Sequence, residues 1–313
     1  MTHAATIGRR SGRVLAILAL GGLFVVSLYR MDLGRALAQL ASVRAGWLSL
    51  ALLCYASILP LWGWQWHLLA PRDATRLFAD MFGVVATTSS VLNTTPLLVG
   101  EATGVALLVA RTRLARAAAF SVLAMDQLLV GAAKLAVLAT AAVVAPLAPW
   151  MTRAVLALLV SLTLLGGALL IASWRHARLR PALLGFMPPR AADVVSSFAV
   201  SLEPLRDPGR GLPALGLALL KKAVEVAAIV CVQRAFGVAL PIGASVVVLA
   251  VLNLATLLPV VPGNVGVFEA AVVLALTRFG VAAEQALGIA VVQHLCYFVA
   301  LATPGLVWTA RGR

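Results

Sequence analysis

The sequence predicts an all-α integral membrane protein, with about six full spans and two broken re-entrant helical hairpins arranged as an inverted repeat. Hydrophobic residues make up 62% of the 313 residues, only 12% are charged, and the mean hydropathy is +1.01. Apolar runs near the ~20 residues needed to cross a bilayer recur along the chain. A soluble helix would carry a polar stripe, and most of these runs carry none. We therefore expect residues 1–313 to form a single membrane domain.

Eight apolar segments follow one another along the chain. They cover residues 14–29, 46–70, 77–110, 117–148, 154–174, 212–232, 242–277 and 284–310. Six of them are expected to be simple spans. The segments 77–110 and 242–277 contain 34 and 36 residues, which is too long for one straight span and short for two.

Each of the two long segments is interrupted near its middle by proline and glycine, with a glutamate close by. The first interruption contains Asn93, Pro96, Gly100 and Glu101. The second contains Pro262, Gly263 and Asn264, and Glu269 follows. A carboxylate beside a broken helix inside a membrane is costly and typically belongs to a functional site. Re-entrant hairpins and pairs of short spans both fit these segments, and both remain open here.

The distribution of arginine predicts that both termini are cytoplasmic. If each broken segment enters and leaves on one side, the inside loops are 1–13, 71–76, 111–116, 175–211 and 311–313. These loops hold sixteen arginines, and the outside loops hold six. Such an excess follows the positive-inside tendency and predicts a multi-pass protein of the cell (inner) membrane.

The two halves of the chain share one plan. Residues 14–148 and 154–310 each have the order span, span, broken hairpin, span, and the polar, proline-rich stretch 175–211 serves as the linker. Glu101 precedes Asp126 by 25 residues, as Glu269 precedes His294. One half starts inside and the other outside, so the second copy is inverted. Inverted repeats with discontinuous helices are typical of transporters.

The helix that restarts after Gly263 is expected to point its N-terminus into the membrane, capped by Asn264. An anionic phosphate would suit such a helix end. Glu101 and Glu269 each lie near the start of a restarted helix. There they can satisfy the helix dipole or bind a cationic group or a proton.

Other charged residues lie within predicted spans. Asp126 is expected to pair with Lys134 through a neighbour or to face His294. Lys221 and Glu225, four residues apart, are expected to pair on one helix face.

Two further groups have simpler interpretations. We expect Lys222 to extend toward the membrane surface. The tryptophans Trp62, Trp64 and Trp66 are expected to form an aromatic belt at the interface.

Several function classes find no support in the sequence. The three cysteines lie in apolar segments and give no disulfide framework or metal-ligand spacing. No nucleotide-binding motif is present, and we expect no catalytic residue, metal or cofactor. The net charge of +14 is explained by arginines in loops, which orient spans and attract anionic lipid headgroups; nucleic acid is not an expected partner.

The two interruptions also carry a family resemblance. Asn93-Thr-Thr-Pro96, then Gly100-Glu101, a basic turn and Asp126 resemble the first signature of the lysylphosphatidylglycerol synthase transmembrane, or flippase-like, family. Pro262-Gly263-Asn264-Val-Gly266-Val-Phe-Glu269 resembles the second. The resemblance covers nearly the whole chain. Full-length members join such a region to a soluble aminoacyl-transferring domain. We expect no such domain after Arg313 and therefore no lysyl transfer.

These observations favour a flippase-like protein that moves a phospholipid or isoprenoid-type lipid through a polar groove at the two interruptions. The expected substrate-binding residues are Asn93, Pro96, Gly100, Glu101, Asp126, Pro262, Gly263, Asn264, Glu269 and His294. Expected partners are phospholipids or other anionic lipids, with a homo-oligomer or a lipid-synthesis enzyme left open. The alternatives are the membrane subunit of a lipid-modifying enzyme, acting on a lipid-linked sugar, hopanoid or cardiolipin, and a non-catalytic membrane scaffold.

Overall fold

The computed structural model describes residues 43–71, 78–95, 99–144, 149–184, 197, 200–257 and 261–310. Within these residues every regular element is helical, which confirms the all-α class. The α-helices are α3 (Ala45–Leu69), α4 (Phe78–Thr94), α5 (Val99–Thr112), α6 (Arg116–Val144), α7 (Pro149–Leu184), α9 (Pro208–Ala235), α10 (Ile242–Ala255), α11 (Val267–Thr277) and α12 (Ala283–Ala310). Two short 3-10 helices, η1 (Glu203–Leu205) and η2 (Pro262–Asn264), connect them. The predicted first span, 14–29, lies outside the described residues.

Three helices in the described part are long and apolar enough to cross a membrane, namely α3, α6 and α12. They correspond to the predicted segments 46–70, 117–148 and 284–310. Helix α9 has 28 residues but carries Lys221, Lys222 and Glu225 near its middle, and it is not among the three.

Helix α7 is longer than predicted. Its 36 residues run to Leu184, so the first ten residues of the expected linker 175–211 are helical. Alanine, leucine and arginine dominate this stretch, and these residue types have high helix propensity. The prolines that suggested a linker from residue 175 onward lie at or beyond position 181.

The first long segment is interrupted where the sequence predicted. It forms α4 and α5, which pack against each other. Gly104 lies opposite Thr88, and Gly100 lies opposite Leu92, so close that an added Cβ would meet these side chains. The later residue on α5, Gly104, contacts the earlier residue on α4, Thr88. The two helices therefore form an antiparallel hairpin. The 17 residues of α4 reach roughly 26 Å, less than the ~30 Å of hydrocarbon.

The second long segment is also interrupted. Helix α10 has 14 residues, η2 follows, and α11 has 11 residues and packs on α10. Gly263 (φ +63°), Asn264 (φ +53°) and Gly266 (φ +84°) adopt left-handed conformations, which end a right-handed helix and favour glycine. The N-cap of α11 is Gly266, so the expected cap Asn264 is wrong. Because these positive φ angles continue to residue 266, the helix starts only after it.

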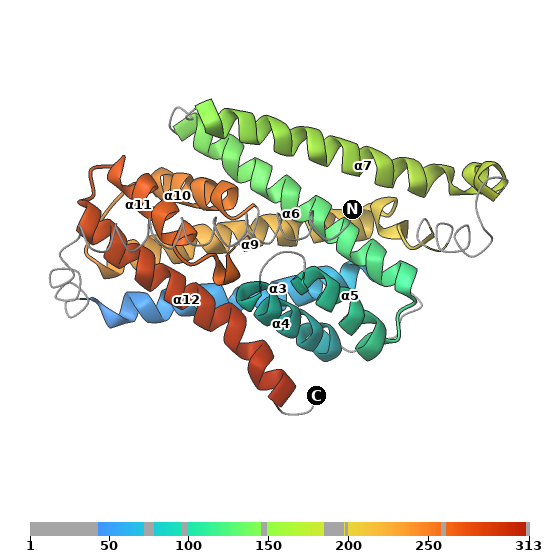
Figure 1. The fold of residues 1–313 in the computed structure, drawn as a ribbon, viewed down its shortest axis with the longest axis horizontal. Coiled ribbons are helices and arrows are strands. Elements are labelled where there is room, and N and C mark those ends of the chain that lie inside the picture. Colours follow the sequence, from blue (N-terminus) through green and yellow to red (C-terminus); the bar gives the residue numbers. More distant parts are fainter. Residues whose placement is uncertain are drawn as a thin grey trace, which may run out of the picture.

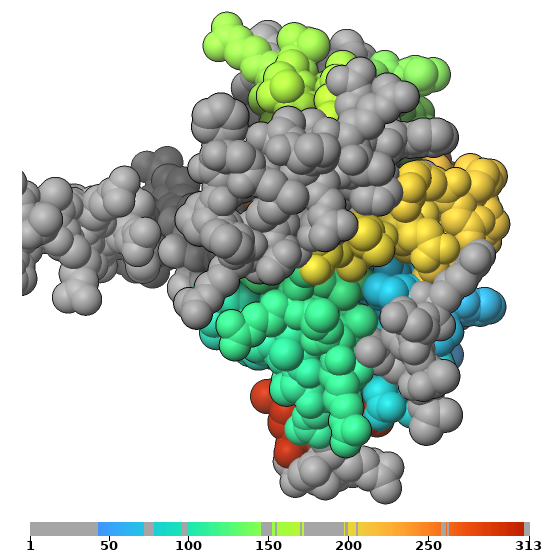
Figure 2. Space-filling view, turned by 90° about the vertical axis from the view of Figure 1, so that its right-hand side faces the viewer, coloured from blue at the N-terminus to red at the C-terminus, as the bar shows by residue number. Residues whose placement is uncertain are grey.

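The long helices α3 and α9 form an antiparallel pair at the centre of the fold (Figure 1). The N–H of Arg44 donates to the carbonyl of Ala235 at 3.0 Å, and at the opposite end the guanidinium of Arg210 donates to the carbonyl of Ala70. Around this pair, α4 packs on α12 and α6 packs on α10. Helix α7 lies at one edge beside α6, and the C-terminal end of α12 lies at the opposite edge (Figures 1 and 2).

Candidate functional site

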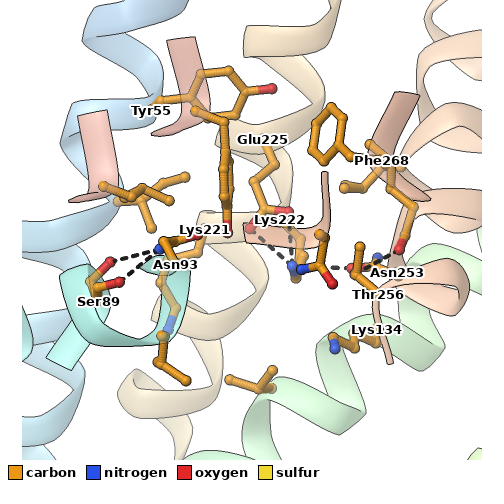
Figure 3. A pocket seen from close by; sticks show the side chains of 18 of the residues that line it. Tyr55, Ser89, Asn93, Lys134, Lys221, Lys222, Glu225, Asn253, Thr256 and Phe268 are labelled. Carbon is orange, nitrogen blue, oxygen red and sulfur yellow. Dashed lines mark hydrogen bonds and ion pairs between the residues drawn. The ribbon is translucent and has the colours of Figure 1, made fainter. Parts of the chain in front are cut away.

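A cavity of about 370 Å³ lies where the two interruptions meet. Helix α4 contacts η2, and a Cβ added to Gly263 would lie 3.1 Å from the carbonyl oxygen of Asn93. Glycine suits this position, because an added Cβ would be tight against that carbonyl and the positive φ favours a residue without a side chain. Side chains from α3, α4, α5, α6, α9, α10, α11 and α12 complete the wall, part of which is drawn in Figure 3.

The structure brings six of the ten expected site residues to this cavity. They are Asn93, Glu101, Asp126, Gly263, Asn264 and His294. Gly100 and Glu269 are not among the lining residues; Gly100 instead packs against Leu92 inside the first hairpin. Pro96 and the side chain of Pro262 lie outside the described part.

Glu269 does not line the cavity but holds His294, which does. Its Oε1 lies 2.7 Å from Nδ1 of His294, and its Oε2 accepts the N–H of Gly266 at 2.7 Å. Phe268 stacks on the His294 ring, with centroids 4.2 Å apart and an interplanar angle of 11°. Both carboxylate oxygens are therefore engaged: one ties α11 to α12, and the other caps α11. The expected role in satisfying the helix start agrees with this geometry.

Asp126 has a partner that sequence reasoning missed. Its side chain is buried, and Oδ1 accepts a hydrogen bond from Nε2 of Gln65 at 2.9 Å. Within the described chain no hydrogen bond or ion pair joins Asp126 to either expected partner, Lys134 or His294, although all three line the cavity, and Lys134 lies two turns farther along α6. Sequence offers no signal for a bond between residues 61 positions apart.

The tryptophans of α3 do not form one belt. Trp64 is 54% exposed, as the prediction requires, but Trp66 is fully buried and Trp62 lines the cavity. Residues two positions apart on an α-helix point to nearly opposite sides, so Trp64 faces away from Trp62 and Trp66. The indole of Trp62 therefore belongs to the cavity wall and not to the membrane surface.

Polar atoms without partners gather around the cavity. Among the described residues, no hydrogen-bond partner reaches Oε2 of Glu101 or Nδ2 of Asn253, and Oδ2 of Asp126 and the amide of Gln293 form no hydrogen bond of good geometry, although the indoles of Trp62 and Trp66 and the hydroxyl of Tyr55 lie near them. Buried polar atoms are costly unless they are hydrogen-bonded. A wall of this kind suits a polar group that enters the cavity. No three His, Cys, Asp or Glu side chains of the described chain could hold a metal ion together.

Comparison with known families identifies the chain. The family model described as "Lysylphosphatidylglycerol synthase TM region" matches residues 13–305. The chain belongs to this family. No curated protein and no solved structure matches it.

In this lysylphosphatidylglycerol synthase TM-region protein, the lysines are the functional candidates that sequence reasoning undervalued. Lys134, Lys221 and Lys222 are the only lysines in the chain, and all three line the cavity. The remaining 22 of its 25 basic residues (25 minus 3) are arginines. The placement of lysine only within predicted spans, with arginine used in the loops, was a signal for these residues in the sequence.

The pairing within α9 also differs from the prediction. Nζ of Lys222 lies 2.9 and 2.8 Å from the two carboxylate oxygens of Glu225, and 3.3 Å from Oδ1 of Asn253 (Figure 3). The predicted Lys221–Glu225 pair and the predicted extension of Lys222 to the surface are therefore wrong. Lys221 turns instead toward α3, where its Nζ lies 5.4 Å from the Trp62 ring centroid. Adjacent helical residues point about 100° apart, so only one of them can face Glu225.

Proposed function

We propose that this protein translocates a phospholipid or an isoprenoid-type lipid between the two leaflets. The headgroup would pass through the cavity while the acyl chains stay in the surrounding lipid. The observation that carries this proposal is the contact between Gly263 and Asn93, which joins two broken hairpins at the wall of a polar cavity. Broken helices that meet in this way are the usual site of substrate binding in transporters.

The pattern of helix contacts supports two inverted halves. We pair α3 with α9, α4 with α10, α5 with α11 and α6 with α12. Each contact then has a counterpart: α4–α12 corresponds to α10–α6, α3–α12 to α9–α6, and α3–α6 to α9–α12. The antiparallel pair α3 and α9 would lie beside the axis that relates the halves.

The short lengths of the hairpin helices support a re-entrant arrangement. Helices α5, α10 and α11 have 14, 14 and 11 residues, and none of these reaches across ~30 Å of hydrocarbon at 1.5 Å per residue. Each hairpin would therefore turn back within the membrane. Its free backbone groups would lie beside the cavity, since such groups are tolerated at that depth only in a protein interior or a wet cavity.

The orientation forms part of the proposal. With re-entrant hairpins, the arginine distribution favours cytoplasmic termini in a cell (inner) membrane. The membrane's own phospholipids would then be both surroundings and substrate.

Reconstitution tests the proposal directly. Proteoliposomes would contain fluorescent short-chain phosphatidylethanolamine or phosphatidylglycerol, and a membrane-impermeant reductant would quench the outer leaflet. We expect the wild-type protein to expose inner-leaflet lipid to the reductant faster than protein-free vesicles do. Equal rates in the two preparations would refute translocation, whereas an enzyme subunit or a scaffold would produce that equality.

A pair of glycine variants tests the junction itself. Gly263 and Gly280 both have positive φ, at +63° and +81°, but only Gly263 lies against Asn93. Alanine costs about 1–2 kcal/mol in either left-handed position. We therefore expect similar losses of stability but a slower rate only for Gly263→Ala. Equal rates for Gly263→Ala and Gly280→Ala would show that the contact between the hairpins takes no part in transport.

A further inference from the structure

Six charged side chains line the cavity besides His294. They are Lys134, Lys221, Lys222, Glu101, Asp126 and Glu225, three of each sign. Four of the six compensate one another. Lys222 occupies both carboxylate oxygens of Glu225, and Lys221 and Asp126 attract each other across the space between α9 and α6.

Lys134 is the cation that remains. It reaches the cavity from α6, and within the described part of the chain no hydrogen bond or ion pair engages its ammonium group (Figure 3). Its electrostatic neighbours are Lys222 and Glu225. Glu225 is already bound by Lys222, and the ammonium of Lys222 repels that of Lys134. The N–H donors of Lys134 are therefore available to a ligand.

Glu101 is the anion that remains. It lies in the first turn of α5, and its buried Oε2 has no hydrogen-bond partner among the described residues. A helix N-terminus favours an acid there only weakly, and less than a hydrogen bond to a charged donor does. Glu101 and Lys134 form no ion pair with each other; the ion pairs near the cavity in the described chain are Lys222–Glu225 and His294–Glu269.

An ammonium and a carboxylate that find no partner within the described chain, both in one cavity, define the charge of the ligand that fits both. A phosphate would accept hydrogen bonds from Lys134, and an ammonium would donate to Glu101. An anionic lipid would leave Glu101 without a partner, and a cationic lipid would leave Lys134 without one. We propose that the cavity selects a zwitterionic phospholipid headgroup, with Lys134 on its phosphate and Glu101 on its ammonium.

The proposal deepens the proposed translocation function and rests on it, but binding can be measured without transport. Native mass spectrometry of the purified full chain would compare three dioleoyl lipids: zwitterionic phosphatidylethanolamine, anionic phosphatidylglycerol and cationic ethylphosphatidylcholine. We expect wild-type protein to bind phosphatidylethanolamine about tenfold more tightly than either of the others, a difference of about 1.4 kcal/mol.

Two neutral variants should change this preference in opposite ways. Glu101→Gln leaves the cavity with one excess positive charge, so phosphatidylglycerol should bind at least as well as phosphatidylethanolamine. Lys134→Gln leaves one excess negative charge, so ethylphosphatidylcholine should become the preferred lipid. The matched controls are Glu284→Gln, an acid in the first turn of α12, and Arg153→Gln on the exposed face of α7. Neither control residue lines the cavity, and both should keep the wild-type preference.

The outcomes separate this inference from translocation. Equal wild-type binding of all three lipids, or a preference that Glu101→Gln leaves unchanged, would overturn the zwitterion assignment even if lipid is transported. A preference for phosphatidylethanolamine that both variants shift as described would support it, even if the proteoliposomes show no translocation. A preference for phosphatidylglycerol in the wild type would likewise overturn it and would favour Lys134 as a site for anionic lipids alone.

Discussion

Replacement of Gln293 by leucine should slow lipid translocation without destabilising the protein. Gln293 lies on α12 at 1% exposure and lines the cavity. Neither Oε1 nor Nε2 has a hydrogen-bond partner among the described residues, although the hydroxyl of Tyr55 lies beside the amide. A buried amide without a hydrogen bond of good geometry costs folding free energy, so we infer that Gln293 has a role with a ligand.

The magnitudes follow from this burial. An unpaired buried amide costs about 1–3 kcal/mol, and leucine has a similar volume without polar atoms. Part of that cost is offset by the nearby hydroxyl of Tyr55. We therefore expect Gln293→Leu to leave the free energy of unfolding unchanged or to raise it by about 1 kcal/mol. A lost hydrogen bond to a charged headgroup is worth about 1.5–3 kcal/mol, which slows translocation roughly 10- to 100-fold if it is made in the transition state.

The assay pairs a translocation rate with a melting temperature in the same lipid. Gln285 provides the matched control, since it lies eight residues earlier on α12, donates to the carbonyl of Phe236 at 3.3 Å and does not line the cavity. Gln285→Leu removes that bond and should cost about 1 kcal/mol of stability, with the translocation rate unchanged. Gln293→Leu should thus slow translocation without a loss of stability, whereas Gln285→Leu should lose stability without slowing translocation.

The reverse pattern would refute the reasoning. If Gln293→Leu melts earlier than wild type and transports lipid at the wild-type rate, Gln293 is a structural residue. The polar wall of the cavity would then not mark a substrate path.

Two further predictions concern contacts that hold the cavity in place. His294→Ala leaves Oε1 of Glu269 without its partner and should lower the free energy of unfolding by about 1–3 kcal/mol. In thermal melts, the double variant with Glu269→Gln should recover part of that loss. Losses that add strictly would contradict the pairing. Gly305→Ala places a Cβ against the carbonyl of Ala86 where α12 crosses α4 and should cost about 1–3 kcal/mol. Gly216→Ala, with nothing within 4 Å, should be neutral or stabilising in the same melts, and equal melting of both variants would argue against the close crossing.

The positions of the two interruptions were predictable because their cause is local. Pro262 and Gly263 disrupt a helix through their own backbone preferences, whatever surrounds them. The cap made by Glu269 is also local, because its carboxylate accepts the N–H of Gly266, three residues earlier in the chain. The family signature lies in these residues for the same reason, since each of them is tied to a backbone conformation.

The pairing of charges was not predictable, because it depends on how each helix is rotated in the fold. Lys221 and Lys222 have almost the same spacing from Glu225, so sequence favours neither strongly. Packing of α9 on α3 turns Lys221 toward Trp62 and leaves Lys222 to face Glu225. The bond between Gln65 and Asp126 likewise exists only because α3 and α6 meet.

The use of lysine in the cavity and arginine elsewhere has a physical rationale if the protein translocates lipid as proposed. A substrate site must bind well enough to admit a headgroup and weakly enough to release it, as in channels. Arginine forms rigid two-pronged bonds to phosphate, whereas lysine is a flexible point charge. Two of the three lysines are further weakened as ligands by internal acids, Lys222 by Glu225 and Lys221 by Asp126. Lys134 forms no ion pair in the described cavity wall and shares its acidic neighbour Glu225 with Lys222. In the proposed translocation, a single lysine bond to a phosphate would be weak enough to break in each cycle.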